Sequence, residues 1–292
     1  MKKKLPIQKK YKNLVLCGGG SKCIAFCGAI KFLEEYNTLR KLKHIIGVSA
    51  GAIVGLFLIL GYTYKEIEEK IDSLNNDIVF GAKCSFAYTI YNLCVNYGTN
   101  NNTALYNYLR NIFIEKEISP DITFEELYIK FNIDFTVGAT NLSHKKLTAF
   151  NRTNTPFVSV IRSIMASTCI PFIFKPINID GTYYVDGGLK NNFPISLVPK
   201  KEYTIALRLE TYDEHENIDI DNSFFSYINT IIDIIFSNTW ADEKITVKNK
   251  KIDIYRIKIP NINFMDFDLD TNIKHQLRNS GYDTLERNFL AF

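Results

Sequence analysis

The chain has 292 residues, 46% of them hydrophobic, and a formal net charge of +4 at pH 7. This apolar content can fill a large core, and no linker rich in Pro, Gly or Ser divides the sequence, so we expect a single domain over residues 13–292. The longest apolar run, residues 52–60, is well under the roughly 18 residues that a transmembrane helix requires, which excludes helical membrane spans. The mild charge does not indicate a nucleic-acid partner, and nothing in the sequence predicts the oligomeric state.

Residues 1–12 form a basic segment, which we expect to be flexible and solvated, with contact to an anionic membrane surface as the alternative. The apolar residues 14–17 that follow are too few for the core of a signal peptide, so no cleaved signal is expected. Six cysteines without metal-binding spacing predict reduced, mostly buried thiols and a cytoplasmic, reducing compartment. We assign any reversible membrane attachment to the lysines of this segment, Lys2, Lys3, Lys4, Lys9, Lys10 and Lys12.

The first predicted strand, residues 13–17, ends in a glycine-rich loop, and a helix follows as far as Glu35. Successive glycines let backbone N–H groups turn toward a negative centre, and the N-terminus of the helix adds partial positive charge. This arrangement is typical of a site for a phosphate or for the oxyanion of ester hydrolysis. A dinucleotide fingerprint would require glycine where Cys23 stands, and no P-loop pattern occurs. The loop consists of Gly18, Gly19, Gly20, Ser21 and Lys22.

A second predicted strand, residues 44–46, runs into the sequence Gly-Val-Ser-Ala-Gly at residues 47–51. A serine between two glycines at this spacing is typical of a nucleophile elbow, a sharp turn from strand to helix that holds the serine oxygen above the edge of the sheet. The following apolar run suits a buried helix whose dipole points at the serine. The alternative is an ordinary turn of small residues. We identify Ser49 as the candidate nucleophile and Gly47 and Gly51 as the glycines of the elbow.

Two further helix starts are indicated by capping boxes. Thr63 with Glu66, and Thr123 with Glu126, have the spacing at which the two side chains satisfy each other's backbone N–H groups. Residues 75–120, between these two starts, are rich in Asn and Tyr, and we assign no chemistry to them.

The next segment alternates strands and helices. Residues 134–139 and 146–150 predict successive strands. A helix is expected to begin at Thr155-Pro156, with proline in its first turn, and to run into a strand at residues 172–174.

A hairpin is expected at Asp180-Gly181, with residues 182–185 as the return strand. The return strand delivers Asp186 at its end, followed by Gly187 and Gly188. A carboxylate in this position is either a candidate acid–base group or a simple turn former.

Three motifs in this order resemble the signature of patatin-like phospholipases and lipid acyl hydrolases. They are the glycine-rich loop at residues 18–22, the elbow at residues 47–51 and the Asp-Gly-Gly sequence at residues 186–188. The segments 166–174 and 192–194 also resemble the surroundings of the aspartate in that family. The resemblance covers roughly residues 13–198 and implies a three-layer α/β/α patatin-like fold with a largely parallel central sheet.

The resemblance also implies the roles of the motif residues. A Ser–Asp dyad takes the place of a triad in this family, so by position Ser49 matches the nucleophile and Asp186 the general base, in a proton-acceptor motif with Gly187 and Gly188. The backbone of residues 18–21 matches the oxyanion hole, and Lys22 its basic position. The implied reaction is phospholipase A-like or lysophospholipase-like hydrolysis of fatty-acyl esters of membrane lipids through an acyl-serine, without metal or cofactor.

Two positions depart from the family pattern. Cys23 stands where the family usually has glycine or another small residue, which predicts a less close approach of the helix to the loop. Cys17 stands where some members have aspartate or serine. Farther along, the acidic run Asp266, Asp268 and Asp270 lacks the glycine and glutamate of a calcium loop, so we expect a solvated turn there.

Two alternative functions stay open. The first is an α/β-hydrolase with a Ser-Asp-His triad, in which His215 or His275 would follow the acid in the chain. The second is a lipid-binding or partner-binding protein that keeps the fold without turnover. In the C-terminal third, residues 203–207 and 252–257 predict strands that complete the sheet, with a helix over residues 224–240 between them.

Overall fold

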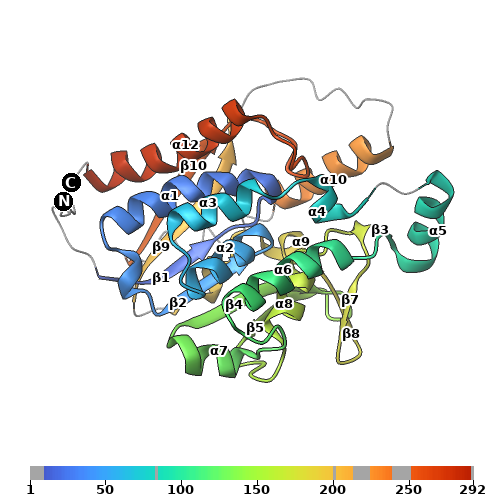
Figure 1. Cartoon of the computed structure of the whole chain (residues 1–292), viewed down its shortest axis with the longest axis horizontal. Helices are drawn as coiled ribbons and strands as arrows, with labels where there is room; N and C mark the ends of the chain where they lie inside the picture. Colours follow the sequence, from blue (N-terminus) through green and yellow to red (C-terminus); the bar gives the residue numbers. More distant parts are fainter. Residues whose placement is uncertain (1–9, 83–84, 200–201, 213–223, 239–250, 291–292) are drawn as a thin grey trace.

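The computed structural model describes residues 10–82, 85–199, 202–212, 224–238 and 251–290. A central eight-stranded sheet, in the order β10-β9-β1-β2-β4-β8-β7 with β5 on β4, is flanked by helices (Figure 1). The expected central sheet with mostly parallel strands is confirmed, and β3 and β6 form a separate two-stranded sheet. The strands are β1 (Tyr11–Leu16), β2 (His44–Val48), β3 (Gly98–Asn100), β4 (Asp134–Asn141), β5 (Lys146–Asn151), β6 (Phe172–Phe174), β7 (Ile177–Ile179), β8 (Thr182–Asp186), β9 (Tyr203–Thr211) and β10 (Ile252–Ile259).

The parallel part of the sheet brings the glycine-rich loop next to the elbow. β1 lies between β9 and β2 and is parallel to both, with Leu16 opposite Gly47. Leu14, Val15 and Leu16 are fully buried, as expected for a strand covered on both faces. Because parallel strands end at the same edge of the sheet, the loop after β1 and the turn after β2 emerge side by side.

Strand β4 is the place where the two halves of the candidate site meet. β5 occupies one edge of β4 over residues 136–141. Because a strand has only two edges, β2 and β8 share the other, β2 along the first five residues of β4 and β8 along the last three. Val48, at the end of β2, lies opposite Gly138, and Asp186, at the end of β8, lies opposite Ala139. The ends of β2 and β8 therefore meet on neighbouring residues of one strand.

The helices begin largely where capping residues predict. Both capping boxes are confirmed, because the Thr63 and Thr123 hydroxyls accept N–H bonds from Glu66 and Glu126, whose carboxylates accept in return. The α-helices are α1 (Ile24–Glu35), α2 (Ala50–Ile59), α3 (Tyr64–Asp72), α4 (Asn76–Phe80), α5 (Phe86–Asn96), α6 (Thr103–Glu115), α7 (Phe124–Phe131), α8 (Val160–Ser167), α9 (Gly188–Asn191), α10 (Phe224–Asn238) and α12 (Thr271–Leu290), and the 3-10 helices are Gly20–Cys23, Leu39–Lys41 and Ile195–Leu197.

The predicted helix start at Thr155-Pro156 is wrong. Helix α8 begins at Val160, with the Ser159 hydroxyl as its cap. The backbone there is held instead by the start of α7 and the residues before it: the Pro156 carbonyl accepts from Glu125 N–H, and the Ile122 carbonyl accepts from Val160 N–H, both at 3.0 Å. Long-range pairing thus overrides the preference of proline for the first turn of a helix.

The hairpin turn at Asp180-Gly181 and the return strand β8 are found as predicted, but the outgoing strand is β7, residues 177–179. Asp180 and Gly181 both have positive φ, 49° and 80°, as a two-residue hairpin turn requires. The strand expected at residues 172–174 exists as β6, which pairs with β3 outside the main sheet.

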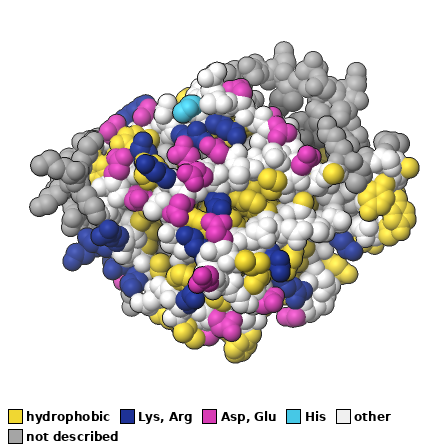
Figure 2. Space-filling model, in the orientation of Figure 1, with side chains coloured by type: hydrophobic (Ala, Val, Ile, Leu, Met, Phe, Trp, Pro, Cys, Tyr) yellow, Lys and Arg dark blue, Asp and Glu magenta, His cyan; other side chains and the backbone are white. Residues whose placement is uncertain are grey.

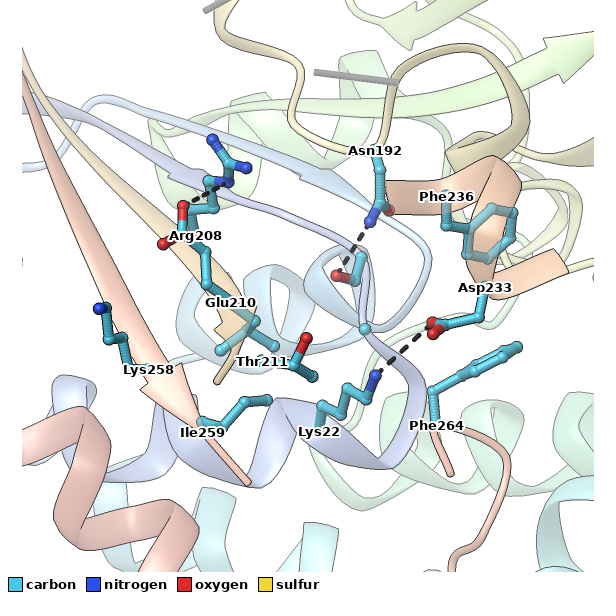
Figure 3. A pocket seen from close by; sticks show the side chains of 13 residues that line it. Lys22, Asn192, Arg208, Glu210, Thr211, Asp233, Phe236, Lys258, Ile259 and Phe264 are labelled. Atoms are coloured by element: carbon cyan, nitrogen blue, oxygen red, sulfur yellow. Dashed lines mark hydrogen bonds and ion pairs between the residues drawn. The ribbon is translucent and has the colours of Figure 1, made fainter. Parts of the chain in front are cut away.

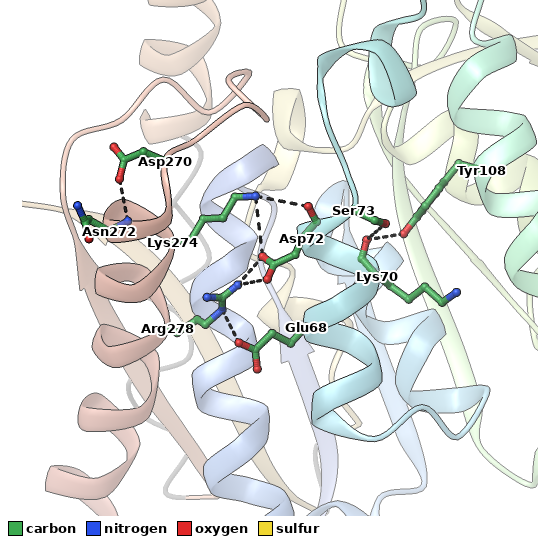
Figure 4. A network of polar contacts seen from close by, with 9 residues as sticks. All are labelled: Glu68, Lys70, Asp72, Ser73, Tyr108, Asp270, Asn272, Lys274 and Arg278. Atoms are coloured by element: carbon green, nitrogen blue, oxygen red, sulfur yellow. Dashed lines mark hydrogen bonds and ion pairs between the residues drawn. The ribbon is translucent and has the colours of Figure 1, made fainter.

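A polar network fastens α12 to α3 across the top of α1 (Figure 4). The Arg278 guanidinium pairs with Glu68, at 2.9 Å, and with Asp72, and the Lys274 ammonium donates to the Asp72 carbonyl oxygen at 3.4 Å. α1, α3 and α12 accordingly lie side by side (Figure 1). The network therefore links the two helices, α3 and α12, that pack on α1, the helix that follows the glycine-rich loop.

Several expectations fall at the limits of the described residues. β1 begins at Tyr11, so the last two residues of the basic segment belong to the sheet, while residues 1–9 lie outside the described residues. α10 starts as predicted at Phe224 and is described to Asn238, so Trp240 lies outside. Within the described parts of the chain, no helix has the length and apolar character needed to cross a membrane.

Candidate active site

Ser49 lies at the sharp turn between β2 and α2. Its backbone has φ 52° and ψ −127°, a conformation that is strained for any residue other than glycine and that holds the side chain out at the end of the strand. The turn is packed so closely that a β-carbon at Gly51 would lie 2.4 Å from the Cys17 carbonyl oxygen. The geometry is that of a nucleophile elbow, with Ser49 directly before the N-terminus of a buried ten-residue helix.

The Ser49 hydroxyl donates to the Asp186 carboxylate, with Oγ 2.7 Å from Oδ2. Asp186 is completely buried and Ser49 is 6% exposed. The other carboxylate oxygen, Oδ1, accepts the Gly188 N–H at 2.7 Å. Burial raises the pKa of Asp186 to about 7, although the hydrogen bonds from Ser49 and Gly188 act in the opposite direction. A carboxyl with this pKa can accept and return a proton near neutral pH.

Ser167 helps to fix the position of Ser49 relative to Asp186. The sequence did not indicate this role for Ser167. Its hydroxyl donates to the Gly138 carbonyl oxygen at 2.6 Å and accepts the Ser49 N–H at 2.8 Å. The Asp186 backbone is held in the same way, because the Thr140 hydroxyl donates to its carbonyl oxygen at 2.8 Å. Strand β4 therefore holds Ser49 through the Ser167 hydroxyl, and holds Asp186 through the hydroxyl of its own Thr140.

The glycine-rich loop lies directly beside the elbow. A β-carbon added to Gly18 would be 3.2 Å from the Ser49 β-carbon. Gly20 has φ 54°, and a β-carbon there would lie 2.0 Å from the Phe264 carbonyl oxygen, so only glycine fits. The backbone beyond β1 thus turns sharply at Gly20 and enters the 3-10 helix that begins α1.

Not every amide of this loop is available to a substrate. The Gly18 N–H donates to the Asn192 carbonyl oxygen at 3.1 Å, and the Ser21 N–H to the Phe264 carbonyl oxygen at 2.8 Å. In the part of the chain that the structure describes, no hydrogen bond engages the amides of Gly19 and Gly20. The two engaged amides hold the loop in shape, which leaves Gly19 and Gly20 as the donors able to face a negative centre.

The Lys22 side chain points into a polar pocket that is lined by Gly18 and Gly19 but not by Ser49 (Figure 3). Its ammonium lies 3.6 Å from the Asp233 carboxylate on α10. The pocket has a volume of about 360 Å³ and also contains the pair formed by Arg208 and Glu210, 3.1 Å apart. The glycine-rich loop is therefore the wall between this charged pocket and Ser49.

A second pocket, on the Ser49 side of the loop, is almost entirely apolar. Its volume is about 50 Å³, little more than the ~30 Å³ that one molecule occupies in liquid water. A long acyl chain would therefore enter only if side chains of the wall moved. The wall is formed by Gly20, Cys23, Ser49, Ala50, Ile53, Val54, Ile71, Leu74, Val79, Phe80, Leu105, Thr168, Ile170, Phe174, Phe264 and Phe267.

The two cysteines that depart from the family pattern are both buried. Burial raises the pKa of Cys17 and of Cys23 to about 12, so both are neutral thiols at ordinary pH. The Cys17 sulfur accepts the Leu209 N–H at 3.3 Å, and Cys23 lines the apolar pocket. Cys23 is thus accommodated as a small apolar side chain beside the loop.

The described histidines do not form a triad with Asp186. His44 is a partly buried residue of β2 whose Nε2 lies 2.8 Å from the Thr136 hydroxyl, and desolvation lowers its pKa to about 4. His275 is exposed on α12, and His215 lies outside the described residues. The position next to the Ser49 hydroxyl is occupied by the Asp186 carboxylate itself.

The acidic run after β10 forms local turns, as expected. The carboxylates of Asp266 and Asp270 accept N–H bonds from Asp268 and Asn272, and Asp268 pairs with the Asn76 side chain at 2.7 Å. Among the described residues, no group of three or more His, Cys, Asp or Glu side chains has the geometry to hold a metal ion.

Comparisons with known proteins agree with this geometry. The chain is 30% identical over 256 residues to a probable lipid hydrolase of Invertebrate iridescent virus 6, and the alignment covers 83% of this chain and 87% of the relative. It is 26% identical over 292 residues to an uncharacterized protein of Acanthamoeba polyphaga mimivirus, covering 97% and 95% of the two chains. The structure resembles the crystal structure of VipD from Legionella pneumophila, with a TM-score of 0.65 at 19% identity over 96% of this chain and 67% of that one.

The family model for patatin-like phospholipases matches residues 14–198, which include the glycine-rich loop, the elbow and the aspartate motif. The match covers more than half of the chain. It ends shortly after Asn192, whose carbonyl oxygen accepts the Gly18 N–H of the glycine-rich loop. By this match and by its fold, the chain belongs to the patatin-like phospholipase family.

Proposed function

We propose that this protein is a serine lipid acyl hydrolase in which Ser49 is the nucleophile and Asp186 the general base. The observation that carries the proposal is the 2.7 Å hydrogen bond from the Ser49 hydroxyl, at a strained elbow, to a buried carboxylate whose pKa is raised to about 7. The amides of Gly19 and Gly20 serve as the oxyanion hole, because Gly20 lines the same pocket as Ser49, Gly19 directly precedes it, and neither amide has an acceptor among the described residues.

The reaction runs in two steps. Ser49 Oγ attacks the ester carbonyl carbon while its proton moves to Asp186 Oδ2, and the carbonyl oxygen becomes an oxyanion held by the two amides. When the intermediate collapses, Asp186 returns the proton to the leaving alcohol, and the acyl group remains on Ser49. Water then attacks the acyl-serine while its proton moves to Asp186. When this second intermediate collapses, the bond between the acyl carbon and Ser49 Oγ breaks, Asp186 returns the proton to Oγ, and the fatty acid leaves. Each step uses only groups of the chain and water.

We infer that the substrate is a phospholipid or lysophospholipid, with the fatty acyl chain on the apolar side of the loop. The apolar pocket opens at Ser49, and the charged pocket with Lys22 and Arg208 lies across the loop. The name of the iridescent-virus relative, a probable lipid hydrolase, supports a lipid ester. We also place the protein in a reducing, cytoplasmic compartment, because the buried cysteines of the described chain are free thiols.

The test compares the wild type, Ser49→Ala and Ser73→Ala on mixed phospholipids and on a soluble nitrophenyl ester. Ser73 is a matched control, because it lies at the exposed end of α3, and its hydroxyl donates to the Lys70 carbonyl oxygen at 2.7 Å. We expect the wild type and Ser73→Ala to release fatty acid and to react with a fluorophosphonate probe, and Ser49→Ala to do neither. Hydrolysis by Ser49→Ala at the wild-type rate would contradict the assignment. A wild type that neither hydrolyses nor reacts would support the lipid-binding alternative instead.

A further inference from the structure

Helix α5 has its polar side chains turned toward the protein and its apolar side chains turned toward solvent. Asn92 is 5% exposed and donates to the Thr99 carbonyl oxygen at 3.4 Å, and Asn96 donates to Asn92 Oδ1 at 3.1 Å. This orientation is the reverse of that of an ordinary surface helix. The exposed apolar side chains of α5 and of the residue after it are Tyr88 (47%), Ile90 (43%), Tyr91 (57%), Val95 (52%) and Tyr97 (69%).

The composition of α5 fits a boundary between water and lipid. None of its residues, from Phe86 to Asn96, carries a charge. Three of the five exposed apolar residues are tyrosines, the residue type enriched where a bilayer meets water. Figure 2 shows a cluster of hydrophobic side chains at the end of the molecule where α5 projects in Figure 1. An exposed cluster of this kind marks an interaction surface rather than a solvated one.

Positive charges lie beside this helix in a groove of about 550 Å³. The Lys175 ammonium donates to Asn96 Oδ1 at 3.1 Å, so it lies at the C-terminal end of α5. Arg162 lines the same groove, and its guanidinium donates to the Asn178 carbonyl oxygen at 2.6 Å. The residues that line the groove include both cations and no Asp or Glu. This charge complements an anionic surface.

The exposed helix is connected to the apolar pocket of Ser49 through β3 and β6. β3 follows α5 directly and pairs with β6, and Phe174 of β6 stacks on Phe80 with ring centroids 5.6 Å apart. Both of these rings belong to the wall of the pocket that contains Ser49. Phe172, two residues before Phe174, is 50% exposed. A lipid drawn from a bilayer in contact with α5 would therefore meet this aromatic wall first.

We propose that α5, together with Tyr97, Lys175 and Arg162, is the surface that docks this protein on an anionic phospholipid bilayer. The inference rests on the proposed function, because that function makes the bilayer the source of the substrate. Binding of the protein to the bilayer does not itself require hydrolysis. It places the docking surface at a site other than the N-terminal lysines, which lie mostly outside the described residues.

The test measures sedimentation with phosphatidylcholine vesicles containing phosphatidylserine, using Ser49→Ala protein so that no lipid is hydrolysed. The docking variant carries Tyr91→Gln, Val95→Gln and Tyr97→Asn, and Asn suits the left-handed backbone of residue 97, where φ is 63°. We expect its vesicle affinity to fall at least about tenfold. The matched control removes three other exposed apolar side chains, by Ile114→Gln, Ile129→Gln and Leu142→Gln, and should bind like the parent.

The charge of the groove is tested separately. Arg162→Gln and Lys175→Gln should each weaken binding to the anionic vesicles by about fivefold and leave the weaker binding to pure phosphatidylcholine unchanged. Equal losses on both kinds of vesicle would contradict the electrostatic part of the proposal.

Cys94 supplies a direct probe, because it is the exposed thiol of α5, while the other described cysteines are buried. In a Cys84→Ser background, we expect anionic vesicles to slow the alkylation of Cys94 by a water-soluble maleimide. An unrelated soluble protein, added in place of the vesicles, should leave the rate of alkylation unchanged. Unhindered alkylation in the presence of vesicles that have bound the protein would overturn the proposal.

Two further outcomes separate this proposal from the proposed function. With active Ser49, the docking variant should hydrolyse a soluble ester as the parent does and lose activity only on vesicles. If the docking variant binds vesicles as the parent does, or if binding falls only when the six N-terminal lysines are replaced by Gln, the assignment of α5 as the docking surface is wrong. The hydrolase assignment would still stand. If the parent self-associates and the docking variant does not, α5 binds a second copy of the chain and the bilayer proposal fails.

Discussion

Replacing Asp186 by Asn should make the protein more stable while removing its activity. The carboxylate is completely buried, and burial raises its pKa from the ordinary 3.8 to about 7. Since one pKa unit corresponds to about 1.4 kcal/mol, the charged carboxylate destabilises the fold by about 4 kcal/mol at pH 8. Asn keeps the local bonds, because its carbonyl oxygen can accept the Gly188 N–H while its NH₂ group donates to Ser49 Oγ.

The sign of the pH dependence follows from the two pKa values. Below pH 3.8 the carboxyl is protonated in the folded and unfolded states, and it imposes no penalty. Between pH 3.8 and about 7 the unfolded chain releases the proton and the folded chain keeps it, so the stability of the wild type falls as pH rises. Above pH 7 the penalty is constant. The variant cannot ionise at this position and does not share the loss.

The measurement is urea unfolding of both proteins at pH 5, 6, 7 and 8. The stability advantage of Asp186→Asn should grow by about 3 kcal/mol between pH 5 and pH 8, and esterase activity should be nearly absent throughout. Asp180→Asn is the matched control, because it removes an exposed carboxylate from a hairpin turn in which Asn fits equally well. A stability difference that does not change with pH would refute the reasoning from desolvation, and retained activity would refute the role of Asp186 as base.

Three other outcomes are expected. For the wild type, kcat/KM on a soluble ester should rise with pH and level off above about 7, where Asp186 is ionised, and a flat profile from pH 5 to 8 would contradict its role. Ser167→Ala removes the hydrogen-bond partner of the Gly138 carbonyl and of the Ser49 N–H. It should therefore lower kcat about tenfold, measured by steady-state kinetics, and lower the free energy of unfolding by about 2 kcal/mol, measured by urea unfolding. Gly19→Ala, whose β-carbon would lie 2.7 Å from the Leu209 methyl, should lower kcat about 100-fold with little change in KM, and a raised KM with an unchanged kcat would exclude an oxyanion hole here.

The sequence predicted those parts of the protein that depend on local backbone chemistry. The elbow around Ser49 and the turn at Gly20 need glycines at fixed positions, and capping boxes at Thr63 and Thr123 satisfy N–H groups three residues away. Each of these patterns is complete within a few residues. The parallel strands were likewise visible as apolar runs between such turns.

Features decided by contacts between distant segments were not predicted. Helix α8 starts at Val160 rather than near Pro156 because the backbone before it pairs with the segment that precedes α7. The family resemblance implied that the amides of residues 18–21 together form the oxyanion hole, whereas the carbonyls of Asn192 and Phe264, far along the chain, engage two of them. The reversed polarity of α5 could not be recognised either, because it depends on which face packs on β3.

The distance between Ser49 and Asp186 is set by a strand to which the sequence assigned no chemistry. Ser49 and Asp186 are 137 residues apart, yet they follow or end two strands that meet on neighbouring residues of β4. Because backbone pairing places both strand ends, and Ser167 links the Ser49 amide to the Gly138 carbonyl, the 2.7 Å contact does not depend on flexible side chains alone. A rigid support of this kind is what allows a strained serine and a desolvated carboxylate to persist together. Gly138 is therefore part of the candidate site, and a β-carbon there would lie 2.8 Å from a methyl group of Val48, the residue before Ser49.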